Sequence, residues 1–335
     1  MDDQGADYAK GPLYGKNMFL PYLIHYHLPA LQARSGEQFD FQYHWSAYYV
    51  QDVQYIENVP LPPTGERYYK KVNIIRDYES FAIELGFSFQ LLEELQIGLD
   101  MRLLSYYGGF LDPLFEEFHS IFGLPNAGRE FFLQNQLYIN IPSDNGVLLF
   151  LDESVTAFGD IDIWGKWTFF ENDSISLAAL GGFKLPTGRL ETLSGSGYPD
   201  LGLGIIADIR PLWYLSIYGQ AGLTLPFNGK SYPMFNGYVG LEIHPWDIFS
   251  FSIQMNIKTS PISNDIGWGW NWDFNTNFKA YSMPQINILV GFMVRSGDFT
   301  WQCYLEEDAI TNQGADLSFN LMFSQRIRPQ GRENR

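Results

Sequence analysis

The sequence predicts an all-β protein, a transmembrane antiparallel β-barrel of about fourteen strands, with twelve strands as the alternative count. Three observations predict this fold. Apolar and polar residues alternate along many short segments, which is typical of strands with one apolar face. The links between these segments alternate between short and long, as in outer-membrane barrels. Charged residues make up only 18% of the 335 residues, whereas aromatic residues make up 17%.

The alternation is clearest over residues 81–90 and resumes over residues 95–103. The same period of two recurs at 251–258 and 317–323, among other segments. The weakest segment is Val147–Glu153, which does not alternate, and omitting it and merging its neighbours gives twelve strands. We expect the apolar face of each strand to meet lipid and the polar face to enclose the lumen, because only helices and closed barrels pair all backbone groups in a bilayer.

The lengths of the links predict which rim of the barrel each one occupies. Short links, expected at the periplasmic rim, are Leu91–Glu94, Ser143–Gly146, Glu171–Ser174, Arg210–Trp213, His244–Asp247 and Arg295–Asp298. Long links, expected outside the cell, are Glu57–Tyr69, Tyr107–Glu130, Pro186–Gly197, Pro226–Met234, Pro261–Tyr281 and Asp308–Gly314. The longest of them should contain one helix, capped by Asp112 and ended by Gly123.

Composition excludes several other classes of protein. Apolar residues, at 46%, are too frequent for a disordered chain, and no apolar run is long enough for a transmembrane helix. A net charge of −17 disfavours binding to nucleic acid. The single cysteine, Cys303, cannot form an intrachain disulfide, and we expect it to face lipid. The first residues do not resemble a signal peptide, so the strand pattern favours an outer-membrane protein whose signal peptide has been removed.

We expect three parts of the chain. Residues 1–36 precede the first clear strand and are predicted to lie in the lumen as a partial plug. Residues 37–327 form the barrel, and residues 328–335 form a C-terminal tail.

Six motifs carry a resemblance to a known family: GPLYGKN at 11–17, FHSIFGLPNAGRE at 118–130, GDIDIWGKW at 159–167, KLPTG at 184–188, SGSGYPDLGLG at 194–204 and GLTLP at 222–226. Together they resemble an uncharacterised family of bacterial outer-membrane barrels of unknown function. The resemblance implies residence in the outer membrane and carries no catalytic or binding residues. The strand count is also similar to that of the bacterial long-chain fatty-acid channels, but their N-terminal Asn-Pro-Ala signature is absent here.

The candidate functional residues are charged residues whose parity places them on the inner face. The acids are Glu84, Asp100, Asp162, Asp208, Glu242 and Glu306, and the bases are Arg102, Lys166, Lys184 and Lys258. They could form a salt-bridged network that fills the barrel, because buried charges require partners. They could also form a constriction that selects solutes by charge.

No cofactor and no metal site is expected. His25 and His27 would share one face of an extended segment, but no third ligand is identifiable. Glu116 and His119 have the spacing of a helical metal site and lack the further helices that such a site requires. The glycines at 202 and 204 lie within a predicted strand, so they do not form a dinucleotide-binding loop.

Three functions remain open. The first is passive passage of an unidentified small solute through a monomeric barrel in the lipid of the outer membrane. The second is a structural or adhesive barrel that binds a partner through the loop at 107–130 or the loop carrying Trp268, Trp270 and Trp272. The third is a lipid-modifying enzyme, for which His44 and His244 are the strand-borne candidates, although neither has an evident serine partner.

Overall fold

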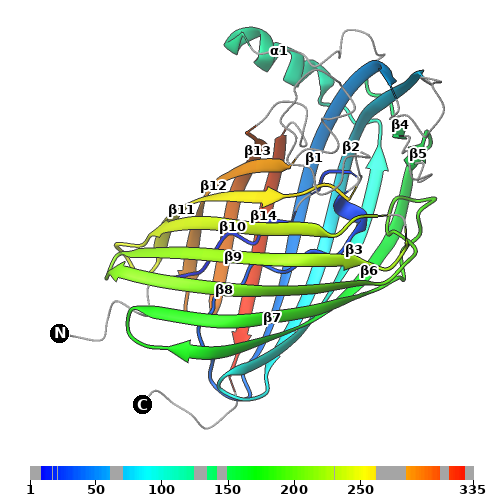
Figure 1. The fold of residues 1–335 in the computed structure, drawn as a ribbon. Coiled ribbons are helices and arrows are strands. Elements are labelled where there is room, and N and C mark those ends of the chain that lie inside the picture. The colour runs from blue at the N-terminus through cyan, green and yellow to red at the C-terminus, as the bar shows by residue number, and fades with distance from the viewer. Residues whose placement is uncertain are drawn as a thin grey trace.

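The structure is a computed structural model that describes residues 9–16, 18–20, 22–60, 71–123, 134–141, 149–229, 231–261, 284–309 and 317–328. Its main feature is a single antiparallel sheet that curves into a barrel (Figure 1). The barrel strands are β1 Phe41–Pro60, β2 Lys71–Gln90, β3 Leu95–Tyr107, β6 Val155–Glu171, β7 Ile175–Leu185, β8 Asp200–Leu212, β9 Leu215–Pro226, β10 Met234–Ile243, β11 Phe249–Lys258, β12 Gln285–Ser296, β13 Phe299–Asp308 and β14 Leu317–Ile327.

The barrel closes because β1 pairs on one side with β2 and on the other side with β14. Ala47, for example, is opposite Ile83 in β2 and opposite Leu321 in β14. Along Phe41–Gln51, where β1 has a neighbour on both sides, the ring has no free sheet edge, so the backbone groups of the strands pair within the protein. The predicted antiparallel barrel is thus confirmed.

Both predicted strand counts describe the sheet. Twelve strands form the closed ring, and two short strands, β4 Tyr138–Ile141 and β5 Leu149–Leu151, extend the sheet from β2. The segment that did not alternate in sequence, Val147–Glu153, contains β5 and lies outside the ring. Its sequence does not alternate because Phe150, which is exposed between the buried Leu149 and Leu151, is also apolar.

The links between neighbouring ring strands separate by length, as the sequence predicted. Short links, such as 91–94, 172–174 and 297–298, lie at one rim, and long links lie at the other. The link Ser143–Gly146 is an exception to the predicted rims. It lies outside the described residues, but the strands it joins, β4 and β5, pair with β2 near Arg76, at the long-loop rim.

The alternation in sequence produces an apolar outer surface. Along β11, Phe251, Ile253 and Met255 are exposed, whereas Ser252 and Gln254 between them are buried inside. Similar alternation runs along β8, β10, β13 and β14. Cys303 in β13 lies on this exposed outer face.

The predicted helix is α1, Asp112–Phe122, and it lies beyond the long-loop rim (Figure 1). Asp112 accepts a hydrogen bond at 2.6 Å from the backbone N–H of Asn135, and Gly123 follows the helix with a φ of 68°. Glycine adopts this left-handed conformation without a steric cost, which explains why the helix ends there. In the described parts of the chain, no helix combines the length and apolar character needed to span a bilayer.

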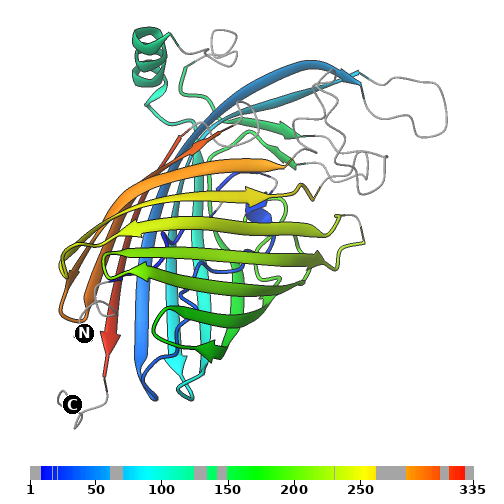
Figure 2. The same ribbon diagram turned by 60° about the vertical axis from the view of Figure 1, so that its left-hand side comes forward.

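The described part of the N-terminal segment, residues 9–36, runs through the inside of the barrel (Figure 2). Its one regular element is a 3-10 helix at Tyr22–Ile24, and none of its described residues joins a strand. Phe19, Tyr22 and Leu23 form an apolar cluster with inward side chains of β1, β2 and β3. This cluster fills the barrel toward the long-loop rim.

Ile205, near the middle of β8, is 59% exposed on the outer face. Replacing Ile205 with arginine should lower the free energy of unfolding in lipid vesicles by about 2–4 kcal/mol, because a charge would enter the hydrocarbon. Leu212→Arg, at the short-turn end of the same strand, should cost about 0–1 kcal/mol. Urea unfolding followed by tryptophan fluorescence measures both values. Equal destabilisation by the two substitutions would contradict a bilayer around this face.

Candidate functional site

The interior of the barrel contains the charged residues selected by parity in the sequence. Nine of the ten side chains are buried and Lys258 is partly buried. The nine are Glu84, Asp100, Arg102, Asp162, Lys166, Lys184, Asp208, Glu242 and Glu306. Most of them contact the N-terminal segment.

One group of charges surrounds Lys16 of the N-terminal segment. The Lys16 ammonium donates a hydrogen bond to Oε2 of Glu84 and lies 3.4 Å from Oδ2 of Asp162. Arg102 lies 3.6 Å from the same Asp162 oxygen and donates to the carbonyl oxygen of Leu23 at 3.1 Å. Buried charges are tolerated when they are paired in this way.

A second group surrounds Lys184 on β7. Its ammonium lies 2.8 Å from Asp160 and 3.2 Å from Asp200, and it donates to the carbonyl oxygen of Ile24 at 2.8 Å. Asp200 in turn accepts the backbone N–H of Tyr26 at 2.9 Å. Lys184 and Asp200 therefore hold the backbone of the N-terminal segment at residues 24–26, and Asp160 pairs with Lys184.

The remaining contacts hold the two ends of the N-terminal segment. Glu242 accepts the backbone N–H groups of Lys10 and Gly11 at 2.9 and 3.2 Å. Asp208 accepts the N–H of Ala33 at 2.8 Å, and Lys166 donates to the carbonyl oxygens of Gln32 and Arg34 at 3.0 and 2.7 Å.

With the hydroxyl of Tyr14 bound to Asp100, eight of the ten charged residues have a described contact with the N-terminal segment. A segment outside any strand has no ladder partners, so its backbone must be satisfied by side chains or water. Five of the eight, Arg102, Lys166, Lys184, Asp208 and Glu242, bind backbone groups of the segment, whereas Glu84, Asp100 and Asp162 bind its side chains. Glu306 differs, because it accepts a hydrogen bond from the Asn287 amide at 2.5 Å.

A cavity of about 770 Å³ opens at the short-turn rim, and we call it the vestibule. Residues of the turns and strand ends line its mouth, including Glu93, Glu171 and Asp298. Tyr14 and His44 line its inner part. Solvent can therefore reach the neighbourhood of His44 from the short-turn rim.

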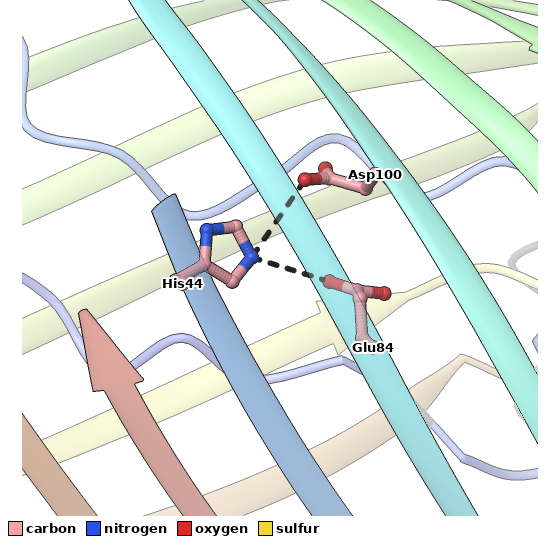
Figure 3. A group of neighbouring side chains, drawn as sticks. All are labelled: His44, Glu84 and Asp100. Carbon is pink, nitrogen blue, oxygen red and sulfur yellow. Dashed lines mark ion pairs between the residues drawn. The ribbon is translucent and has the colours of Figure 1, made fainter. Parts of the chain in front are cut away.

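His44, Glu84 and Asp100 form a cluster on β1, β2 and β3 (Figure 3). Nε2 of His44 lies 3.8 Å from Oε1 of Glu84 and 3.7 Å from Oδ1 of Asp100. The ring of Tyr14 packs edge-on against the His44 imidazole, with centroids 4.7 Å apart. The second Asp100 oxygen accepts the indole N–H of Trp164 at 3.0 Å.

The register of the three strands explains the cluster. His44, Gly86 and Asp100 are directly opposite one another on β1, β2 and β3, so their Cβ vectors share the inner face. A Cβ at Gly86 would lie only 1.9 Å from Cε1 of His44 and 2.4 Å from Oδ1 of Asp100. The absence of a side chain at Gly86 therefore lets His44 and Asp100 meet above it.

The candidates for a metal site weighed from the sequence alone are not brought together. Nδ1 of His25 lies 3.2 Å from Asp200, whereas Nδ1 of His27 lies 2.8 Å from the carbonyl oxygen of His25. The two imidazoles therefore have separate partners. The side chain of His119, the expected partner of Glu116, lies outside the described residues, as do Trp268, Trp270 and Trp272.

His244 has a serine neighbour that the sequence did not make evident. Oγ of Ser216 lies 2.9 Å from Nε2 of His244, because the β9–β10 register places Ser216 opposite Glu242, two residues before His244. Both residues are buried, at 0% and 1% exposure, and burial lowers the pKa of His244. Within the described structure Nδ1 of His244 has no hydrogen-bond partner, so no third group orients the ring as in a catalytic triad.

Sequence reasoning did not select several residues that the interior uses. Lys16 and Tyr14 lie in a segment without periodicity, so no pattern gave their contacts. Asp160 and Asp200 share the parity of Asp162 and Asp208 and could have been found by extending the alternation toward the long loops. His44 is two residues from Ser46, so the alternation predicted that both face the lumen. Its closeness to Glu84 and Asp100 could be predicted only from the strand register.

The closed antiparallel ring, with an apolar outside and a charged inside, is a β-barrel of the outer-membrane type. The chain belongs to the family described as "Protein of unknown function (DUF3187)", whose model matches residues 66–271. This match confirms the resemblance to an uncharacterised barrel family, and five of the six motifs lie within the matched residues.

Solved structures with the same fold include the COG4313 outer membrane channel from Pseudomonas putida F1. It is similar over 88% of this chain and 97% of its own, with 10% sequence identity and a TM-score of 0.53. The NanC porin is similar over 85% of this chain and 100% of its own, with 6% identity and a TM-score of 0.47. No curated protein matches the chain.

Gly86→Ala should destabilise the barrel by about 1–3 kcal/mol, since overpacking displaces His44 and Asp100. Gly165→Ala on β6 is the matched control, because its Cβ would meet its nearest atom, the carbonyl oxygen of Gln96, at an ordinary 3.8 Å. Unfolding midpoints in detergent compare the two variants. A Gly86→Ala protein as stable as Gly165→Ala would show that the cluster does not need this space.

Proposed function

We propose that this protein is a passive channel for small polar solutes in the bacterial outer membrane, and that its N-terminal segment is the gate. The observation that carries the proposal is the set of eight interior charges that contact a segment belonging to no strand. The apolar outer face, and the fold shared with an outer-membrane channel, support the proposed location in the outer membrane.

The manner in which the segment is held supports a gate rather than a fixed filling. Its contacts with the wall are hydrogen bonds and ion pairs from side chains, together with apolar packing around Phe19 and Tyr22. The ladder between the ring strands does not include it, so the segment can move without breaking the barrel. The segment occupies the interior between the vestibule at the short-turn rim and the apolar cluster around Phe19 and Tyr22, so its departure would enlarge the path through the barrel.

Lys16→Glu should open the channel. The new carboxylate would lie beside Glu84 and Asp162, and like charges in close contact cost several kcal/mol. In planar lipid bilayers we expect the time-averaged conductance to rise about tenfold or more above that of the unmodified protein.

The matched control is Arg328→Glu, which makes the same change of charge at the mouth of the vestibule. Arg328 pairs with Asp298 at 3.2 Å and has no described contact with the N-terminal segment, so conductance should stay near the unmodified value. A folded Lys16→Glu protein that neither conducts nor releases small solutes from liposomes would contradict the proposal.

The open channel should prefer cations. Departure of the segment removes Lys10 and Lys16 and leaves, besides the Asp52–Arg76 ion pair, the acids Glu84, Asp100, Asp160, Asp162, Asp200, Asp208, Glu242 and Glu306 and the bases Arg102, Lys166, Lys184 and Lys258. Acidic side chains in a pore favour cations. The reversal potential of Lys16→Glu channels in a potassium chloride gradient measures this preference. A potential of the opposite sign would contradict the expected excess of negative charge along the path.

A further inference from the structure

We infer that His44, Glu84 and Asp100 bind one divalent transition-metal ion of the zinc type at the inner end of the vestibule. The ligand atoms are Nε2 of His44, Oε1 of Glu84 and Oδ1 of Asp100, which all lie within 4.8 Å of one another (Figure 3). Imidazole nitrogen and carboxylate oxygen are ligands that zinc takes in proteins. The inference does not depend on whether the barrel conducts.

Two of the three spacings are close to those of a metal site, and the two carboxylate oxygens lie within 4.8 Å of each other. Metal bonds of about 2.1 Å in a tetrahedral site place ligand atoms roughly 3.4 Å apart. The distances from Nε2 of His44 to the two carboxylate oxygens, 3.8 and 3.7 Å, need to shorten by only a few tenths of an ångström. Both distances are too long for a hydrogen bond.

The three ligand atoms are also buried without hydrogen bonds. Glu84 is 0% exposed, Asp100 is 2% exposed and the side chain of His44 is 10% exposed. Nowhere among the described residues does Nε2 of His44, Oε1 of Glu84 or Oδ1 of Asp100 find a hydrogen-bond partner. Buried polar atoms are nearly always satisfied in native proteins, so three unsatisfied atoms directed at one point indicate a ligand between them.

The other oxygens of the two carboxylates are held from behind. Oδ2 of Asp100 accepts hydrogen bonds from the Trp164 indole at 3.0 Å and from the Tyr14 hydroxyl at 3.3 Å. Oε2 of Glu84 is paired with Lys16. Outer contacts of this kind orient metal ligands. Each carboxylate therefore presents one free oxygen to His44.

Charge and access favour a cation at this position. The three acids Glu84, Asp100 and Asp162 exceed the two bases Lys16 and Arg102 of the same network by one negative charge when His44 is neutral. His44 lines the vestibule, which opens at the short-turn rim and gives an ion a path from solvent. A protonated His44 would also balance this charge, but at 3.7 and 3.8 Å its N–H makes no hydrogen bond to either carboxylate, whereas a metal ion would bind all three atoms.

The test is a calorimetric titration of tag-free protein in detergent with zinc chloride, after treatment with EDTA. We expect one zinc ion per chain. Asp100→Asn and His44→Gln should each weaken binding by about 100-fold or more, because each removes a ligand. Migration of unheated samples on a denaturing gel shows whether each variant has folded.

The matched controls are Glu306→Gln and His244→Gln, which replace a buried acid and a buried histidine outside the cluster and should bind zinc as the unmodified protein does. Zinc-edge X-ray absorption of the unmodified protein should show a shell of oxygen and a single imidazole. Absence of stoichiometric binding, a shell of several imidazoles, or unchanged binding by folded Asp100→Asn and His44→Gln would each overturn the inference.

Discussion

The interior of this barrel depends on one constraint: the backbone of a segment that joins no strand must find hydrogen-bond partners inside a closed ring. Glu242, Asp208 and Asp200 accept its N–H groups, while Lys184, Lys166 and Arg102 donate to its carbonyl oxygens. The acidic side chains thus lie at N–H groups of the segment, and the basic side chains lie at its carbonyl oxygens. The positions of the charged residues on the barrel wall therefore match the positions of the backbone groups of the segment.

The same constraint connects the two proposals. Lys16 and Tyr14 hold the rear oxygens of Glu84 and Asp100, and so fix the front oxygens that face His44. A channel gate and a metal site would therefore share two carboxylates. Movement of the segment would alter the geometry around His44, and a bound ion would alter the charge that holds Lys16.

The ring could be predicted from the sequence because its outer face is apolar and its inner face is polar. Along each strand this difference appears as alternating apolar and polar residues. Segments such as 251–258 followed the pattern closely, and the alternation of loop lengths gave the two rims. The strands β4 and β5 could not be placed in this way, since Leu149, Phe150 and Leu151 are all apolar although they alternate between buried and exposed. The alternation of residues placed Glu84, Asp100 and His44 on the inner face. The short distances between the three side chains depend on the strand register and on the space above Gly86, and neither can be read from the alternation alone.

The closure between the first and last ring strands has a consequence for biogenesis. The backbone of Lys10 binds Glu242 across 232 positions, and β1 gains its second neighbour only when β14 docks. Native contacts between such distant positions form slowly, because the chain between them loses conformational entropy before the contact stabilises the fold. The N-terminal segment precedes the strand that closes the barrel, so we expect its enclosure and the pairing of β1 with β14 to belong to the same late stage of assembly.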